Sequence, residues 1–225
     1  MFNGFNQEGI LFLKDLAANN NKEWFEQHRL AYDNYLLKPL KQLTADLQLT
    51  IKSIDTEIET TPSINKTISR IYRDTRFSTD KSPFRTMQWI SFRRPAKTWG
   101  NVPEFYFWFT PEKYEYGMGF YSATPKNMEK IREHIASCPD RFKKEIIDYY
   151  KAQDTFVLEG ENYKRPVPNS LPEEFQQWLQ KKNLCLSCKK EINKTFFSSG
   201  LKDILEKAFA ANSRLYRFFI ESIMP

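Results

Sequence analysis

Apolar and polar residues alternate at helical spacing through the first fifty positions. Residues 6–19 carry an apolar face of this kind, which predicts an amphipathic helix. Asn21 follows at a position suited to capping a second helix. A third helix is predicted from Pro39, because proline fits the first turn of a helix. Residues 55–66 are polar and rich in turn-forming residues, which predicts a loop.

The hydrophobic period changes from helical to alternating after residue 66. Four segments rich in aromatic and β-branched residues are predicted to be strands, at 67–73, 87–93, 103–110 and 113–121. The last two are expected to form a hairpin. In the fourth, Gly117 and Gly119 share a face with Glu115, which leaves room for close approach of a helix or a ligand. We interpret these glycines as sites of helix packing.

The second half of the chain is mainly helical in its pattern. The predicted elements are helices at 125–137, from Pro139, at 172–181, at 200–211 and at 213–222, short extended pieces at 155–168 and a strand at 184–192. Asn212 or Ser213 is expected to cap the last helix. This order of elements predicts one α+β domain over residues 1–225, with a mostly antiparallel sheet flanked by N-terminal and C-terminal helices.

The composition is that of a globular protein with an aromatic core. Apolar residues make up 40% of the chain, and 19 Phe with 11 Tyr predict a core of large rings. The sequence shows no signal peptide and no run of about 18 apolar residues, the length of a membrane span. Three cysteines form no disulfide framework. We therefore expect a cytoplasmic protein that does not bind membranes.

Positive charge is concentrated in one segment. Between Lys66 and Lys97 there are nine Lys and Arg residues against two acidic residues, and the rest of the chain is neutral to within one charge. Arginine makes bidentate contacts with carboxylate and phosphate, and lysine adds a point charge. We therefore predict a small anionic ligand, with phosphate as the favoured group. The predicted ligand-binding residues are Arg70, Tyr72, Arg73, Arg76, Lys81 and Arg85.

Two residues are candidates for catalysis. Asp74 would orient one guanidinium through an ion pair, or act as a base if the protein is an enzyme. His28 lies at helical spacing between Trp24 and Tyr32, where it could carry a proton, although ring packing explains the same stripe. No reaction and no cofactor is predicted.

Other interpretations of the basic segment stay open. It could be a solvated surface on which Asp74 and Asp80 pair with two of the cations. Alternatively, the protein could be a protein-interaction domain that binds no small ligand. It could also bind nucleic acid, with bases stacking on Tyr72, Phe77, Trp89 and Trp99.

No metal site is expected. Cys185 and Cys188 form a lone CxxC in a predicted strand, where their sulfurs point to opposite faces. His134 and Cys138 are spaced to share a helix face, but Cys138 also continues the apolar face of that helix. Structural zinc sites normally show two close pairs of ligands.

Two stretches of the chain resemble a known family. One is Asn19-Asn20-Asn21-Lys22-Glu23-Trp24-Phe25, and the other runs from Ser69 to Thr86 with Arg73-Asp74-Thr75-Arg76-Phe77-Ser78-Thr79-Asp80-Lys81-Ser82-Pro83 at its centre. Over most of its length the chain resembles the uncharacterised microbial proteins grouped as domain of unknown function 2461. The typical pattern has Tyr-Lys where this chain has Phe84-Arg85, which excludes a role for a tyrosine hydroxyl at position 84. The resemblance implies a cytoplasmic single-domain protein and no particular activity.

Overall fold

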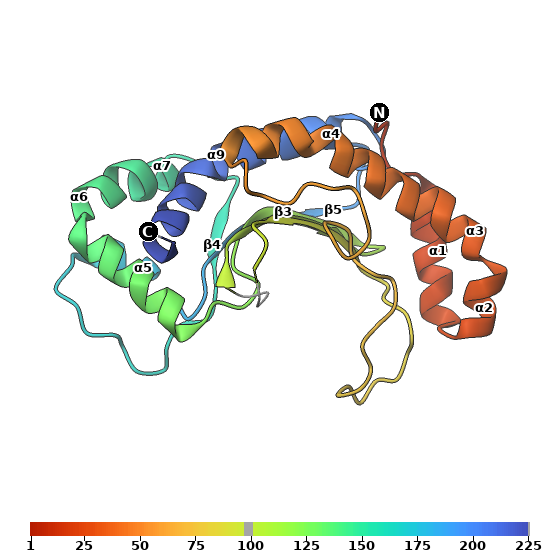
Figure 1. Ribbon diagram of the computed structural model, residues 1–225, viewed down its shortest axis with the longest axis horizontal. Coiled ribbons are helices and arrows are strands. Elements are labelled where there is room, and N and C mark those ends of the chain that lie inside the picture. The colour runs from red at the N-terminus through yellow and green to blue at the C-terminus, as the bar shows by residue number, and fades with distance from the viewer. Residues whose placement is uncertain (97–100, 225) are drawn as a thin grey trace. The chain divides into compact units, whose positions relative to one another are not determined.

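The computed structural model describes residues 1–96 and 101–224 (Figure 1). Contacts along the chain group it into two compact units. Unit 1 comprises Met1–Phe92, Tyr106–Tyr116 and Lys189–Ala208, and unit 2 comprises Arg93–Phe105, Gly117–Cys188 and Phe209–Pro225. The single domain expected from the sequence stays a prediction.

Unit 1 begins with the predicted helices. Their bounds are α1 Gln7–Ala18, α2 Lys22–Gln27, α3 Arg29–Tyr32, the π-helical η1 Asp33–Leu37 and α4 Lys38–Ile54. The side chain of Asn21 caps α2 as predicted, accepting a hydrogen bond from the N–H of Trp24 at 2.9 Å. The second helix is nevertheless interrupted, because His28 has non-helical dihedral angles of φ −108° and ψ 12°. Trp24, His28 and Tyr32, which the sequence predicts on one face of a helix, therefore do not lie on one continuous helix.

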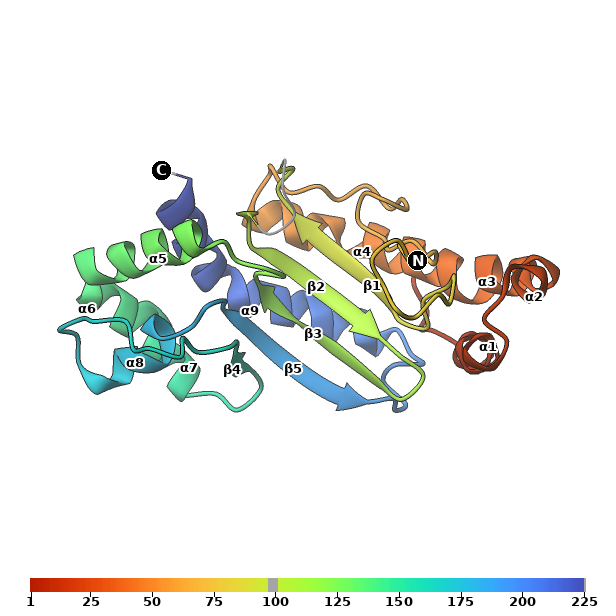
Figure 2. The same cartoon turned by 90° about the horizontal axis from the view of Figure 1, so that it is seen from below.

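The described residues form a five-stranded antiparallel sheet in the order β1-β2-β3-β5-β4 (Figure 2). The strands are β1 Gln88–Arg93, β2 Glu104–Phe109, β3 Lys113–Gly119, β4 Val157–Glu159 and β5 Cys185–Glu191. The N–H of Thr110 donates to the carbonyl of Lys113 at 2.8 Å, which closes the predicted hairpin between β2 and β3. The α+β class with flanking helices is confirmed.

Aromatic rings fill the core of both units, as the composition predicts. In unit 1, Phe5 packs against Phe109 and Phe196 with ring centroids 4.7 and 4.8 Å apart. In unit 2, Phe105 packs against Tyr216 at 4.9 Å. All five rings are buried. Such ring pairs contribute about 0.5–1.5 kcal/mol each beyond their burial of apolar area.

The strand predicted at 67–73 does not form. The chain there makes two isolated antiparallel bridges, Ile68 with Ile90 and Tyr72 with Phe84. Between them the N–H of Trp89 donates to the hydroxyl of Ser69 at 3.0 Å. A side chain thus takes the place of a backbone carbonyl, and the ladder is not continuous.

The two helices predicted at the C-terminus are one helix, α9 Gly200–Ile223. Asn212 is fully buried within it and does not act as a cap. Its side-chain oxygen accepts a hydrogen bond from the hydroxyl of Tyr150 at 2.7 Å. This tertiary partner satisfies the amide oxygen inside the helix, so the polar residue does not end it.

Unit 2 carries the remaining helices. They are α5 Pro125–Ser137, α6 Pro139–Phe142, the π-helical η3 Lys143–Ile147, α7 Asp148–Lys151 and α8 Glu173–Leu179. The hydroxyl of Thr124 caps α5, accepting from the N–H of Asn127 at 3.2 Å. None of the described helices is both long and apolar enough to cross a membrane.

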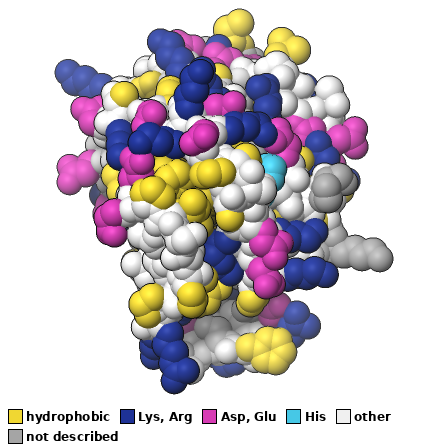
Figure 3. Space-filling model, turned by 90° about the vertical axis from the view of Figure 1, so that its left-hand side faces the viewer, with side chains coloured by type: hydrophobic (Ala, Val, Ile, Leu, Met, Phe, Trp, Pro, Cys, Tyr) yellow, Lys and Arg dark blue, Asp and Glu magenta, His cyan; other side chains and the backbone are white. Residues whose placement is uncertain are grey.

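Charges of both signs are interspersed on the face shown in Figure 3, which looks onto the side of Figure 1 where α5 and α6 lie. Arg141 pairs with Glu221 at 2.7 Å, and Lys151 pairs with Glu174 at 2.9 Å. This face therefore resembles an ordinary solvated surface, unlike the basic segment of unit 1.

Candidate functional site

Residues 70–87 form a two-legged arm of unit 1, gold in Figure 1, which extends from the sheet on the side away from α4. Its legs are joined by two backbone hydrogen bonds of 2.8 Å, from Arg73 to Pro83 and from Arg85 to Ile71. The basic residues that the sequence places in one segment are thus distributed over two adjacent legs.

The base of the arm is anchored to the N-terminal helices. Phe84 is 1% exposed and stacks on Phe25 of α2, with ring centroids 4.3 Å apart. The side chain of Asn20 bonds the backbone of Phe84 twice, accepting from its N–H and donating to its carbonyl, both at 3.0 Å. Residues about sixty positions apart are therefore held together at this point.

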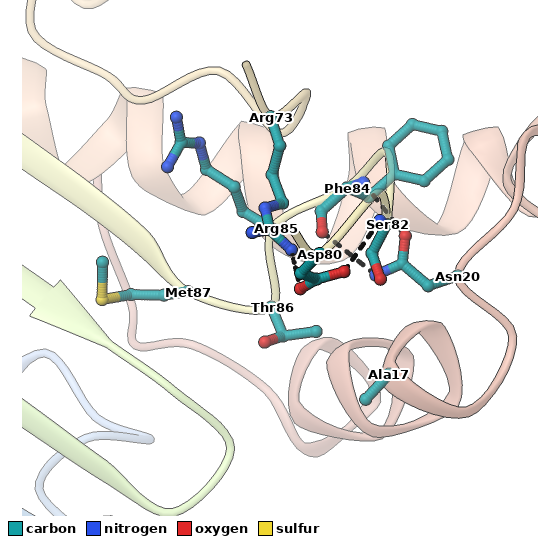
Figure 4. A pocket seen from close by; sticks show the side chains of 9 residues that line it. All are labelled: Ala17, Asn20, Arg73, Asp80, Ser82, Phe84, Arg85, Thr86 and Met87. Atoms are coloured by element: carbon teal, nitrogen blue, oxygen red, sulfur yellow. Dashed lines mark hydrogen bonds and ion pairs between the residues drawn. The ribbon is translucent and has the colours of Figure 1, made fainter. Parts of the chain in front are cut away.

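A pocket of about 350 Å³ opens between the arm and the junction of α1 and α2 (Figure 4). Its lining residues are Ala17, Asn20, Arg73, Asp80, Ser82, Phe84, Arg85, Thr86 and Met87. Arg73 and Arg85 reach it from different legs of the arm. The lining residues thus include two arginines, two hydroxyl residues, an asparagine and an aspartate. In Figure 4 the guanidinium of Arg73 lies at Asp80, whereas that of Arg85 points away from this pair.

The carboxylate of the pocket, Asp80, is already paired. It forms an ion pair with Arg73 and accepts a hydrogen bond from the N–H of Ser82 at 2.9 Å. Hydrogen bonds from Ser82 and Arg73 hold the pKa of Asp80 well below its usual range. Asp80 is therefore ionised at neutral pH, and its charge sits against the guanidinium that an anionic ligand would use.

The second carboxylate of the arm is also paired. Asp74 makes a bidentate contact with Arg76, at 2.9 Å to Nε and 2.7 Å to a terminal nitrogen. Five cations and two carboxylates leave the arm with a net charge of +3. Both pairs match the solvated-surface interpretation, but they neutralise less than half of the positive charge.

The pocket brings together two of the six predicted ligand-binding residues, Arg73 and Arg85. The other four do not line it: Arg70, Tyr72, Arg76 and Lys81. Lys81 donates to the carbonyl of Thr75 at 3.0 Å and so braces the tip of the arm. Tyr72 packs its ring against Phe84 at 5.0 Å. Lys81 and Tyr72 therefore stabilise the shape of the arm.

A family model described as "Conserved hypothetical protein (DUF2461)" matches residues 8–218. The chain belongs to this family. No curated protein matches it. The two stretches that carry the resemblance to DUF2461 are the ones that meet at the pocket, through the contacts of Asn20 and Phe25 with Phe84.

Three polar residues of the pocket were not singled out from the sequence: Asn20, Ser82 and Thr86. Each lies within one of the two stretches typical of the DUF2461 family. Their place in these two stretches is the feature of the sequence that could have indicated a role in the site. The sequence could not show that Asn20, which follows α1, faces the arm.

The two catalytic candidates have different surroundings. Hydrogen bonds from Arg76 lower the pKa of Asp74 to about 2. A carboxylate with so low a pKa is a poor proton acceptor at neutral pH, which disfavours Asp74 as a base. His28 stacks on Trp24 with ring centroids 4.0 Å apart and is not among the residues that line the pocket.

Cys185 and Cys188 lie in β5, the strand predicted for them. The sulfur of Cys138 contacts the carbonyl of His134 at 3.0 Å. Within residues 1–96 and 101–224, no three His, Cys, Asp or Glu side chains are grouped so that they could hold a metal ion.

Unit 1 contains a further polar cluster on the sheet, which the sequence analysis did not propose as a site. Glu115 of β3 is buried, accepts a hydrogen bond from the hydroxyl of Tyr106 at 2.8 Å and lies 4.0 Å from the ammonium of Lys189. A buried carboxylate requires such partners. The alternation of β3, which separates Glu115 from the tyrosines of the core, was the available signal.

Replacing Asn20 with alanine should loosen the base of the arm. The change removes both bonds to Phe84, and we expect a loss of about 1–2 kcal/mol in the free energy of unfolding. Hydrogen exchange at the amide of Phe84, which donates to Asn20, should become faster. Asn19→Ala is the matched control, because the side chain of Asn19 makes an exposed bond to Asp15. Equal protection of the Phe84 amide in both variants would show that Asn20 does not anchor the arm.

Proposed function

We propose that the protein binds a phosphate-bearing anion in the pocket of the arm. The observation that carries the proposal is the meeting of Arg73 and Arg85, from two legs of the arm, in one pocket with the hydroxyls of Ser82 and Thr86. Guanidinium groups match the geometry of phosphate oxygens, and hydroxyls supply further donors. No reaction is assigned to the pocket.

The electrostatics of the arm support an anion over a neutral ligand. The arm has a net charge of +3, and its two carboxylates are both engaged by Arg73 and Arg76. A ligand with two negative charges reduces the repulsion among the remaining cations. It can compete with the carbonyl of Tyr72, to which Arg85 donates at 3.4 Å. It can also compete with Asp80 for Arg73.

Nucleic-acid binding is the second hypothesis for the same arm, and the aromatic residues argue against a long stacking track. Tyr72 is packed on Phe84, and the ring of Trp89 lies under the guanidinium of Arg85 at 5.0 Å. Trp99 lies outside the described residues. Of the predicted platforms that the structure describes, Phe77 alone is almost completely exposed. One platform suits a small ligand better than a strand, which normally stacks several bases.

A protein-interaction domain is the third hypothesis. The most exposed large apolar side chains within residues 2–96 are Leu30 in α3, Leu49 in α4 and Phe77 on the arm. They belong to separate elements, and apolar side chains exposed singly are usual on soluble proteins. These residues therefore give less support to a protein partner than the charge of the arm gives to an anion.

Inorganic phosphate should stabilise the protein against heat. At a concentration ten times its dissociation constant, a ligand of the folded state adds about 1.4 kcal/mol. For a chain of this size, that raises the melting temperature by about 3–6 °C. Arg85→Ala should lose most of this rise. Arg76→Ala removes the same charge outside the pocket and should keep it.

Asp80→Asn provides a test of opposite sign. Asparagine can still accept the hydrogen bond from Ser82, but it no longer offers Arg73 a negative charge. Phosphate should therefore bind more tightly to this variant than to the wild type. A phosphate effect that is the same in the wild type, Arg85→Ala and Asp80→Asn would contradict the proposed site.

A further inference from the structure

Phe77 has no packing role that would explain its presence at the tip of the arm. Its side chain is 95% exposed. The guanidinium of Arg76 lies 5.7 Å from the centre of its ring, and Arg76 is itself held by Asp74. A cation over an aromatic face is worth about 0.5–1 kcal/mol at an exposed site, so this contact restrains the ring without burying it.

Phe77 is adjacent in sequence to a residue that contacts an arginine of the pocket. Arg73, which lines the pocket, also donates to the hydroxyl of Ser78 at 3.4 Å. Ser78 directly follows Phe77, and successive Cα atoms are about 3.8 Å apart. Arg73 therefore contacts the residue next to Phe77, so that a phosphate at Arg73 has the exposed ring close to it in the chain.

The arm is ordered by its own contacts before any ligand arrives. Lys81 bonds the carbonyl of Thr75, and Ser78 donates from its N–H to the same carbonyl at 3.4 Å. The tip is thus crossed by bonds on both sides of Phe77. A binding surface that is ordered in advance loses less conformational entropy when it takes a ligand.

We propose that the ligand of this site is a nucleotide, with its base flat on Phe77 and its phosphate at Arg73 and Arg85. This inference rests on the proposed function and adds the base to the phosphate. Every nucleobase has a flat aromatic face that stacks on a ring, and an adjacent guanidinium adds to the contact. Among the described residues of the arm, Phe77 is the only ring that is almost fully exposed, because Tyr72 is 42% exposed and packs against Phe84. One free platform suits a single nucleotide better than a strand.

The test compares AMP with ribose 5-phosphate, which carries the same sugar and phosphate without the base. Calorimetric titration of the wild type should show AMP binding about 5- to 150-fold more tightly, the range expected for one stacked base. Phe77→Ala should bring AMP down to the affinity of ribose 5-phosphate, whose own binding stays unchanged. Phe77→Trp keeps a ring and should keep the preference for AMP.

Two controls accompany these variants. Leu49→Ala truncates an apolar side chain that is 86% exposed on α4, and it should leave both affinities unchanged. Arg85→Ala should weaken AMP and ribose 5-phosphate by the same factor, because both carry the phosphate.

The outcomes separate the inference from the proposed function. If ribose 5-phosphate binds and Arg85→Ala weakens it, but AMP binds no more tightly, the nucleotide is wrong and the phosphate site stands. If neither compound binds and inorganic phosphate does not either, both proposals are overturned. A twelve-residue oligonucleotide that binds more than tenfold tighter than AMP, with an affinity that falls steeply with salt, would identify a nucleic-acid strand instead.

Discussion

Phe84→Ala should lower the free energy of unfolding by about 3–5 kcal/mol, the usual cost of removing a fully buried phenylalanine ring. Phe84 is 1% exposed, stacks on Phe25 and packs at a tilt against Tyr72 at the base of the arm. Removing the ring leaves a cavity where the arm meets α2. Urea denaturation measures the loss, and limited trypsin digestion should show faster cleavage at the Arg and Lys residues of the arm.

Phe77→Ala is the matched control for this prediction, because it makes the same chemical change on the same arm. Its ring is 95% exposed and contacts the guanidinium of Arg76, so the free energy of unfolding should change by no more than about 1 kcal/mol. A loss below about 2 kcal/mol in Phe84→Ala, or similar losses in both variants, would show that the ring of Phe84 does not anchor the arm.

Gly119→Ala should destabilise the protein by about 1–3 kcal/mol or more, through overpacking. A methyl group at this position would lie 2.4 Å from the carbonyl oxygen of Leu184 and 2.6 Å from the Cα of Cys185. Both atoms belong to backbone that cannot give way as a flexible side chain can. Thermal or urea unfolding measures the effect.

Gly200→Ala provides the comparison. There the added methyl group would meet the hydroxyl of Ser198 at 3.2 Å and a methyl group of Thr195 at 3.9 Å. Alanine also favours helix over glycine by about 1 kcal/mol, so this variant at the start of α9 should be neutral or slightly stabilised. If Gly119→Ala were tolerated equally well, the close approach at Leu184 would not be a constraint on the fold.

The helices and strands that follow from local pattern could be predicted from the sequence. The cap at Asn21 and the helix at 125–137 depend on residues within one or two turns, and both are present. The glycine of β3 was predicted to face a helix, but the chain that approaches Gly119 is the start of β5. Which segment approaches a glycine depends on sheet order, and a local pattern does not contain that information.

The predictions from sequence are wrong where a residue distant in the sequence determines the local structure. Asn212 reads as a helix cap until the hydroxyl of Tyr150 is known to satisfy it. The segment 67–73 has the composition of a strand, yet the bond from Trp89 to Ser69 interrupts its pairing. In both cases one side-chain hydrogen bond outweighs the propensity of the segment.

The charge pattern indicates which segment contains the candidate site, but it does not give the geometry of the site. The cluster of Arg and Lys, which has too few acidic residues to balance it, lies in the segment that borders the pocket; its role in binding stays a prediction. The part played by each cation depends on where the two legs of the arm bend. Sequence spacing could not distinguish Arg85, which lines the pocket, from Arg76, which pairs with Asp74 outside it.

The pairing of Asp80 with Arg73 has a consequence for selectivity. A monocarboxylate offers that guanidinium the same charge and geometry that Asp80 already supplies, and it gains little by exchange. A dianionic phosphate brings an additional charge and an additional oxygen, so we expect it to exchange with Asp80 more readily. If the pocket binds phosphate as we propose, this internal carboxylate would give it a preference for phosphate esters over organic monoacids.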